Sequence, residues 1–275
     1  MSDLIKTSDI INAIVINNRD VKLNDEYIHS LDIDQTNGNF VIAKPIKNGG
    51  TVTIYPQSPQ YPQYSLLGEV KEFTQFSGYG ELSYVLDTKV DYVRQALWIA
   101  DAGNSRVLRI NMKTFTVSMV INNIIVPHSI AIDINNGSVF VKGFKDIETG
   151  VVHHYDSGGN NLSNFEFNCD FPAEEIELIS TADFAKLLPL ASCMTFDHVR
   201  DRVWWTANAD VHMIDLVNIE HVFQRLTDYV GSGGVDIDFA TGYCFAAMLS
   251  NRNQWKMVQI FKDNNKVMSE GYIPY

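Results

Sequence analysis

The stretch Ser129-Ile130-Ala131-Ile132-Asp133-Ile134-Asn135-Asn136-Gly137-Ser138-Val139-Phe140 carries the pattern that decides the fold. A small residue opens a run with apolar residues at alternate positions, an aspartate ends the run, and a short glycine-containing turn leads into a second apolar run. The pattern occurs five times in the chain, and the aspartates that end the first runs, here called the anchor aspartates, are Asp34, Asp87, Asp133, Asp197 and Asp238. Alternation with a period of two is typical of β-strands, and one unit repeated at intervals of about 40 to 50 residues predicts a propeller or a solenoid.

Aligning the five repeats on these aspartates predicts the strands of each unit. The residue four positions before the aspartate is always small, as expected for the innermost strand of a propeller blade: Ser30, Ser83, Ser129, Cys193 and Gly234. The second repeat fits only with a four-residue insertion around Asp91 to Gln95. Third strands are expected from Gly50, Arg106, Val151, Val211 and Lys256, and fourth strands from Val70, Thr116, Leu162, His221 and Val267.

The sequence therefore predicts an all-β fold, a single β-propeller domain over residues 1–275 with five four-stranded blades. A sixth, degenerate blade is the alternative, in the long interval between Asp133 and Asp197 or formed by the two termini together. Residues 1–28 precede the first repeat, and we expect them to close the last blade beside the strand from Val267, because a closed ring leaves no exposed strand edge. Apolar residues at helical spacing predict a short helical insertion near residues 173–188.

The segment Leu97-Trp98-Ile99-Ala100-Asp101-Ala102-Gly103-Asn104-Ser105-Arg106-Val107-Leu108-Arg109-Ile110 resembles an NHL repeat. That pattern is an apolar run, Ala-Asp, a small residue, Gly, Asn, any residue, Arg and Val, and the other repeats match it poorly. The resemblance implies a propeller fold. It also implies a range of functions, because NHL-type propellers include protein-binding and RNA-binding modules, and related six-bladed propellers include lactonases and lyases.

Composition limits the partners and the setting. The net charge is −12, from 33 acidic and 21 basic residues, so nucleic acid is not an expected partner. The three cysteines lack a CxxC spacing and indicate no disulfide framework, and we expect Cys193 and Cys244 to be buried thiols. The amino terminus lacks the design of a signal peptide and no apolar run has membrane-spanning length, which predicts cytoplasmic synthesis and no membrane contact.

Two aspartates are the candidate metal ligands. Asp32 and Asp236 occupy the same position, two residues before the anchor, in the first and last repeats. If the ring closes, these repeats are neighbours, and two inward carboxylates could hold a hard cation such as Ca²⁺ or share a proton. The alternative is that both are hydrogen-bonded to the backbone or to water. The anchor aspartates themselves are expected to be structural, because aspartate at a strand end accepts hydrogen bonds from its own turn.

A tyrosine-rich proline loop is the candidate binding surface. Tyr55, Tyr61 and Tyr64 lie in or beside the run from Tyr55 to Tyr64, where three prolines exclude regular structure. Exposed tyrosines of this kind suit contact with a protein or a glycan. The alternative is that the loop folds back and buries them on its own blade.

Two functions remain open at this stage. The first is a non-enzymatic propeller that serves as an interaction or structural module with protein partners, as a component of a larger particle such as a phage virion or tail. The second is a metal-dependent hydrolase or lactonase with a divalent ion near the axis. We favour the first because no recognisable catalytic constellation, such as a Ser-centred elbow, a phosphate-binding loop or an HExxH motif, occurs in the sequence.

Overall fold

The computed structural model describes residues 30–46, 49–56, 70–146, 149–168, 193–207, 210–226, 229–250, 252, 255–260 and 267–272. These residues form five four-stranded antiparallel sheets and one small two-stranded sheet. The strands of the first three large sheets are β1 (Ser30–Ile33), β2 (Phe40–Ile46), β3 (Gly49–Tyr55) and β4 (Lys71–Phe73); β7 (Val85–Asp91), β8 (Ala96–Asp101), β9 (Arg106–Asn111) and β10 (Thr116–Asn122); and β11 (Ile125–Ile132), β12 (Val139–Phe144), β13 (Thr149–Tyr155) and β14 (Asn161–Asn168).

The last two large sheets complete the series. Their strands are β15 (Met194–Asp197), β16 (Arg202–Ala207), β17 (Asp210–Asp215) and β18 (Glu220–Arg225), and β19 (Tyr229–Asp238), β20 (Tyr243–Ser250), β21 (Trp255–Ile260) and β22 (Val267–Tyr272). The small hairpin consists of β5 (Gln75–Phe76) and β6 (Gly80–Glu81), and a 3-10 turn, η1, covers Ala102–Asn104. The predicted four strands per repeat are confirmed.

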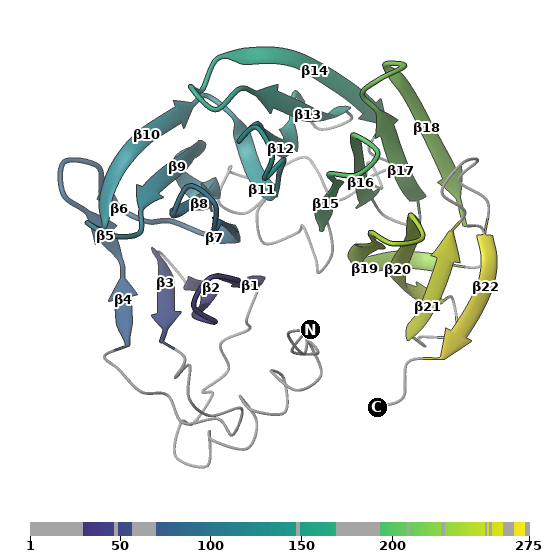
Figure 1. The fold of residues 1–275 in the computed structure, drawn as a ribbon, viewed down its shortest axis with the longest axis horizontal. Coiled ribbons are helices and arrows are strands. Elements are labelled where there is room, and N and C mark those ends of the chain that lie inside the picture. The colour runs from purple at the N-terminus through teal and green to yellow at the C-terminus, as the bar shows by residue number, and fades with distance from the viewer. Residues whose placement is uncertain are drawn as a thin grey trace.

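The five sheets follow one another around an arc, with the first and fifth sheets at its two ends (Figure 1). Within each sheet the strands pair in sequence order. The first strand of each repeat lies toward the centre of the arc, and the fourth strands β10, β14, β18 and β22 lie on its outside (Figure 1). This arrangement is that of propeller blades, so the predicted position of the first strands is correct.

The hydrophobic core is divided among the contacts between adjacent sheets. One cluster joins Trp98 and Val107 of the second sheet to Ile130 and Val141 of the third, and similar clusters join the other neighbouring pairs of sheets. Trp98, Trp204 and Trp205 are at most 1% exposed. Burying a side chain of this size contributes on the order of 2 to 3 kcal/mol. The second strands of the second, third and fourth sheets are apolar on both faces because each of these sheets is covered by a neighbour on either side.

The turn of the second repeat differs from the sequence alignment. Strand β7 continues through Asp87 and ends at Asp91, so Asp91 is the residue that begins the turn. In the observed register Lys89 pairs with Trp98, just as Asp32 pairs with Val41 and Asp236 pairs with Phe245. The predicted insertion around Asp91 to Gln95 is therefore wrong. The sequence offers an aspartate at both positions, and only the pairing with β8 chooses between them.

Several expectations fall on parts of the chain that the structure does not describe. They are the closing role of residues 1–28, the helix near residues 173–188 and the positions of Tyr61 and Tyr64. No helix among the described residues has the length and hydropathy of a membrane span.

Candidate functional site

The inner strands carry a column of side chains two residues before each turn aspartate. With the second repeat aligned on Asp91, this column consists of Asp32, Lys89, Ala131, Thr195 and Asp236. The two predicted metal ligands therefore share their column with a lysine. Sequence alignment missed Lys89 because the second repeat was placed four residues too early.

Lys89 is the cation that balances the acidic groups around it. Burial would lower the pKa of Lys89, but the charges of Asp87, Asp32 and Asp236 outweigh this effect and raise the pKa above its usual value. Lys89 therefore stays protonated at neutral pH. Its ammonium forms no hydrogen bond or close ion pair with any residue in the described ranges, so it acts here through the field of its charge.

Asp32 is held at the edge between the first and second sheets. Its Oδ2 accepts a hydrogen bond of 2.6 Å from the backbone N–H of Val90. Burial raises the pKa of Asp32, although Lys89 and the N–H groups of Val90 and Ile33 oppose the rise. Asp236, at the other end of the arc, accepts a hydrogen bond from Ile237 N–H and is exposed.

Asp87 links three sheets instead of capping a turn. Its carboxylate accepts hydrogen bonds from Ser30 Oγ at 2.6 Å in the first sheet and from Ile130 N–H at 2.7 Å in the third. Ser129 Oγ donates a further bond at 3.3 Å. Asp87 therefore has a structural role, as expected, but these hydrogen-bond donors lie in the neighbouring sheets and not in its own turn. The small column of Ser30 and Ser129 leaves the room that this carboxylate fills.

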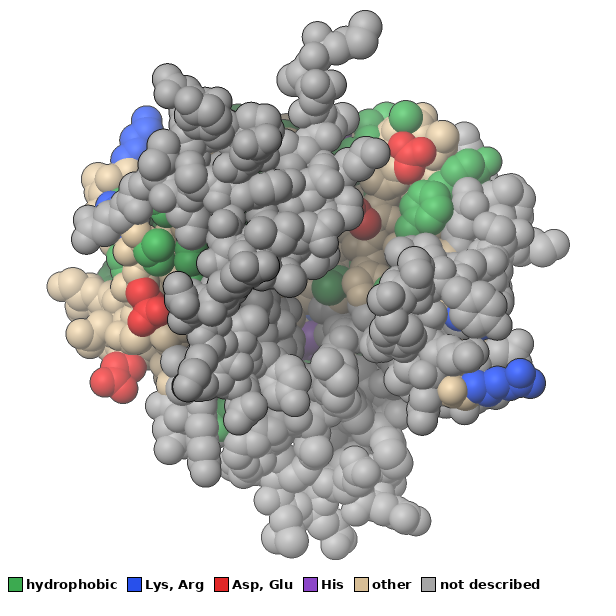
Figure 2. Space-filling view, turned by 90° about the horizontal axis from the view of Figure 1, so that it is seen from below, with side chains coloured by type: hydrophobic (Ala, Val, Ile, Leu, Met, Phe, Trp, Pro, Cys, Tyr) green, Lys and Arg blue, Asp and Glu red, His purple; other side chains and the backbone are tan. Residues whose placement is uncertain are grey.

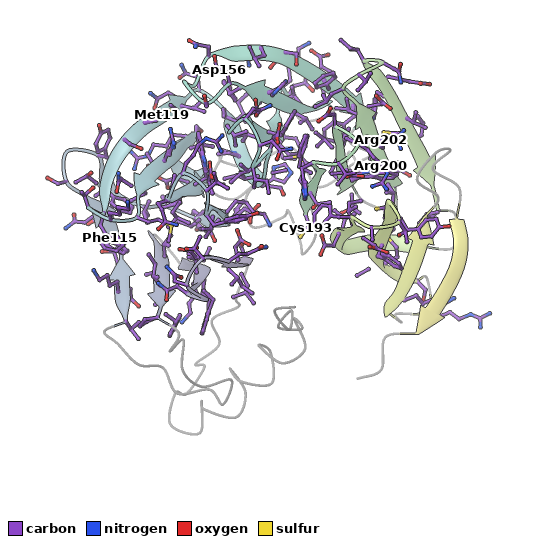
Figure 3. The ribbon with its side chains drawn as sticks, viewed as in Figure 1. Phe115, Met119, Asp156, Cys193, Arg200 and Arg202 are labelled. Atoms are coloured by element: carbon purple, nitrogen blue, oxygen red, sulfur yellow. The ribbon has the colours of Figure 1, made fainter. Side chains whose placement is uncertain are left out.

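The two described cysteines lie in different surroundings. Cys193 is exposed, which corrects the expectation that its thiol is buried, and Figure 3 shows it toward the centre of the arc. Cys244 is buried as expected, and burial raises the pKa of its thiol well above the usual range.

The cation site at Asp32 and Asp236 stays a prediction. Within the described part of the chain, no group of three or more His, Cys, Asp or Glu side chains is arranged to hold a metal ion. The charge of Lys89 acts on both aspartates and would repel a Ca²⁺ ion bound between them.

The turns that begin at the anchor aspartates, or at Asp91 in the second repeat, lie together at one end of the sheets. This anchor-turn face comprises residues 34–39, 92–95, 133–138, 198–201 and 239–242, together with the turn at residues 216–219 that lies at the same end of the fourth sheet. Four anchor aspartates accept backbone N–H bonds from their own turns, as predicted: Asp34, Asp133, Asp197 and Asp238. Asp91 does the same in the second repeat.

The fourth residue after each turn aspartate has a left-handed backbone in all five repeats. Glycine supplies it in three of them, with φ of 75° at Gly38, 82° at Gly137 and 78° at Gly242. Gln95 and Asp201 adopt it without glycine, at φ of 51° and 52°. This shared conformation is independent support for Asp91 as the second turn aspartate.

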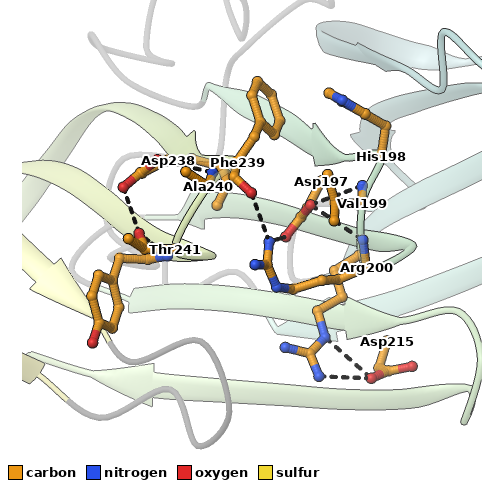
Figure 4. Close-up of polar contacts among 12 residues, drawn as sticks. Asp197, His198, Val199, Arg200, Asp215, Asp238, Phe239, Ala240 and Thr241 are labelled. Atoms are coloured by element: carbon orange, nitrogen blue, oxygen red, sulfur yellow. Dashed lines mark hydrogen bonds and ion pairs between the residues drawn. The ribbon is translucent and has the colours of Figure 1, made fainter.

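Two arginines on this face form contacts between neighbouring sheets. Arg94 pairs with Asp91 at 3.2 Å and donates to the carbonyls of Ile134 and Asn135 in the next sheet. Arg200 pairs with Asp197 at 3.1 Å and donates to the carbonyl of Phe239 (Figure 4). Each guanidinium lies against a glycine of the next turn, Gly137 or Gly242, where a side chain would collide with it.

The interface between the third and fourth sheets is different, because it contains a pocket of about 240 Å³. Aromatic rings form part of its wall, with Phe140 stacked on His154 at 4.2 Å and on Phe196 at 5.4 Å. Its other lining residues are Asp133, Asn136, Ser138, Asp201, Leu216 and Val217. Burial lowers the pKa of His154, although Asp133 and Asp156 oppose this, so the ring is neutral at neutral pH. The lining is therefore acidic.

Exposed apolar side chains surround this region of the anchor-turn face. Val199, Val217, Ile219 and Phe239 of the fourth and fifth sheets are 58%, 71%, 74% and 40% exposed. The ring of Phe239 lies 4.3 Å from that of His198, so the turns of these two sheets touch. Sequence analysis gave no weight to these residues, although turn positions occupied by valine, isoleucine and phenylalanine were a visible signal.

Tyr55, a predicted binding residue, lies at the end of β3. Its ring stacks on Phe40 at 5.0 Å, and the residue is half-buried. Burial, together with the charge of Glu72, raises the pKa of its hydroxyl. Tyr55 therefore packs partly on its own blade.

The NHL-like segment has a structural role at the opposite end of the second sheet. Asp101 is fully buried and accepts bonds from Arg106 Nε at 2.7 Å and from Ser83 N–H at 2.7 Å. Arg106 also donates to the carbonyl of Tyr79 at 2.6 Å. The Asp, Asn and Arg of the motif thus hold the chain that enters β7 against the turn between β8 and β9.

Comparison with known proteins identifies the fold and nothing finer. No protein-family model matches the sequence, and no curated protein matches it significantly. Among solved structures, a nidogen/laminin complex is similar, with a TM-score of 0.62 at 10% sequence identity over 90% of this chain and 81% of that chain. Together with the five sheets, this similarity shows that the chain is an all-β protein with a β-propeller fold.

Proposed function

We propose that this protein is a non-enzymatic β-propeller interaction module that binds a protein partner on its anchor-turn face. The observation that carries the proposal is the group of exposed apolar residues at the turns of the fourth and fifth sheets, Val199, Val217, Ile219 and Phe239. Exposed apolar side chains gathered at one place are typical of protein interaction sites. A second support is that a similar solved structure is a complex of two proteins.

Charge indicates what kind of partner fits. The chain carries a net charge of −12, and the pocket beside the apolar residues is lined by Asp133 and Asp201. The view from below shows described acidic and hydrophobic side chains at the surface of the molecule (Figure 2). A partner surface with apolar residues and basic groups would complement this face. A particle setting, such as a phage virion or tail, belongs to the same proposal, and a glycan ligand at Tyr55 stays a prediction.

The alternative, a metal-dependent hydrolase, has weaker support. It requires several ligands around one divalent ion, and the described residues offer only Asp32 and Asp236 as predicted ligands, with the charge of Lys89 acting on both. The interaction module needs no such constellation.

A matched pair of substitutions tests the proposed face. Ile219 lies on the anchor-turn face, whereas Ile125 begins β11 at the opposite end of the third sheet, and both side chains are exposed. The partner is identified by cross-linking in a lysate of the source cells and then purified. Titration calorimetry should show that Ile219→Asp weakens its binding by about tenfold or more, because a charge replaces an apolar contact.

Ile125→Asp is the control and should leave the dissociation constant unchanged. Circular dichroism and Tm measurements establish that both variants are folded. Equal binding by wild type and Ile219→Asp would contradict the proposed face, and so would an equal loss in both variants.

A further inference from the structure

The turns repeat one arrangement at two sheet interfaces and lack it at the next one. At the second–third and fourth–fifth interfaces, an arginine three residues after the turn aspartate pairs with that aspartate and fills the space against a glycine of the next turn. At the third–fourth interface, the corresponding three positions are Asp133, Asn136 and Asp201. All three line the pocket.

The pocket therefore lies where the molecule elsewhere places its own guanidinium group. Asn136 is too short to reach across, and Asp201 adds a second carboxylate at the position that is glycine in the third and fifth sheets. The volume of about 240 Å³ is several times the roughly 30 Å³ that one water molecule occupies.

We infer that this pocket binds an arginine side chain supplied by a partner protein, in the position that Arg94 and Arg200 fill at the neighbouring interfaces. That a partner protein supplies the arginine rests on the proposed function. The preference of the pocket for a guanidinium group rests on the pocket residues alone.

The carboxylate of Asp133 is the first element of the site. Asp133 is only 4% exposed, and its Oδ1 accepts the N–H of Asn135. Its Oδ2 accepts no hydrogen bond within the described ranges. By contrast, the corresponding carboxylates of Asp91 and Asp197, each 1% exposed, also pair with an arginine. A nearly buried carboxylate that lines a pocket and has one oxygen without a donor favours a ligand that brings one.

The second carboxylate and the aromatic wall select the kind of cation. The carboxylate of Asp201 makes no hydrogen bond to another described residue. No Lys or Arg is among the lining residues. A guanidinium group can pair with a carboxylate through two N–H groups and stack on an aromatic face, whereas an ammonium cannot do both. The rings of Phe196 and His154 line the pocket and offer that face, so arginine is preferred over lysine.

The inference is tested with a peptide probe, acetyl-Leu-Arg-Leu-amide, titrated into the full-length protein and followed by the NMR shift of the His154 ring. We expect saturable binding of this peptide, at least tenfold weaker binding of its lysine analogue, and no binding of its citrulline analogue, which is similar in shape but uncharged. Asp201→Asn changes an exposed side chain and should weaken the arginine peptide by about tenfold. Glu72→Gln, in the exposed strand β4 of the first sheet, is the matched control and should change nothing.

Asn136→Arg provides a second, opposite test. It introduces the arginine that the second–third and fourth–fifth interfaces carry, so it should fill the pocket from within, abolish peptide binding and raise Tm by about 2 °C. Asn122→Arg, at the exposed end of β10, controls for the added charge.

Equal binding of the arginine and citrulline peptides, or binding that survives Asn136→Arg, would overturn the inference. Its failure is distinct from failure of the proposed function. A partner that is lost on Ile219→Asp but retained on Asn136→Arg would support the interaction face and reject the arginine pocket.

Discussion

The interfaces closed by Arg94 and Arg200 differ from the interface between the third and fourth sheets, which is left open. In the closed interfaces a guanidinium joins a buried aspartate to carbonyls or to glycine of the next turn. In the open one, Asn135 Nδ2 donates to the His198 carbonyl at 3.2 Å, and the space beside this bond is a pocket. The difference shows that the fold does not need an arginine at each interface, so the open one is available for binding.

The largest loss of stability among the tests of this comparison is expected from Gly137→Ala and Gly242→Ala. Both glycines have positive φ, and an added Cβ would collide with the guanidinium of Arg94 or Arg200. We expect each substitution to lower the free energy of unfolding by about 2 kcal/mol, from backbone strain and the displaced arginine together. Urea unfolding measures the change. Gly158→Ala, at a turn position without positive φ or an arginine contact, is the control, and an equal loss there would show that neither the positive φ nor the arginine contact accounts for the effect.

A smaller effect is expected from removing the arginines. Arg94→Ala and Arg200→Ala each leave a buried aspartate without its ion pair, but the arginines are 25% and 22% exposed, so solvent screens the pairs. We expect a loss of about 1 kcal/mol each. Each variant should also gain a pocket like that of the third–fourth interface.

Guanidinium at millimolar concentration should therefore raise the Tm of Arg94→Ala relative to the same concentration of sodium ion. Wild-type protein has only the third–fourth pocket to fill, so its rise should be smaller than that of Arg94→Ala, which has two. If the variant and wild type respond alike, the closed and open interfaces are not equivalent.

The smallest effect is expected from Asp201→Gly. Asp201 holds a left-handed backbone at φ of 52° that glycine adopts without strain. The substitution should stabilise the fold by about 0.5 kcal/mol and weaken binding of the arginine peptide. Thermal unfolding and peptide titration on the same samples measure the two changes. A loss of stability would indicate that Asp201 has a structural role at the interface.

Much of the fold was predictable, and particular residues show why. The alternating runs before Asp34, Asp133, Asp197 and Asp238 define the inner strands, and each of these aspartates begins a turn as expected. The second repeat was misplaced because Asp87 and Asp91 both follow apolar residues in one long strand. Only the pairing of Lys89 with Trp98 separates them, and pairing partners are distant in sequence.

The candidate site was less accessible to sequence reasoning. The prediction of Asp32 and Asp236 as a pair depended on position alone, and the structure adds Lys89 to their column. Asp133, Asn136 and Asp201 do not form a motif in the sequence. These three residues can be recognised as a candidate site only when the third–fourth interface is compared with the interfaces where Arg94 and Arg200 occupy the same place.

The sequence by itself determined the strands, the turns and their repetition, because side-chain alternation and turn chemistry act between residues that are close along the chain. The tertiary structure decided which charges meet at the axis and which interface stays open. Those outcomes depend on contacts between sheets, where residues far apart in the chain come within hydrogen-bonding distance, such as Asp87 with Ser30, 57 positions apart, and Asn135 with His198, 63 positions apart.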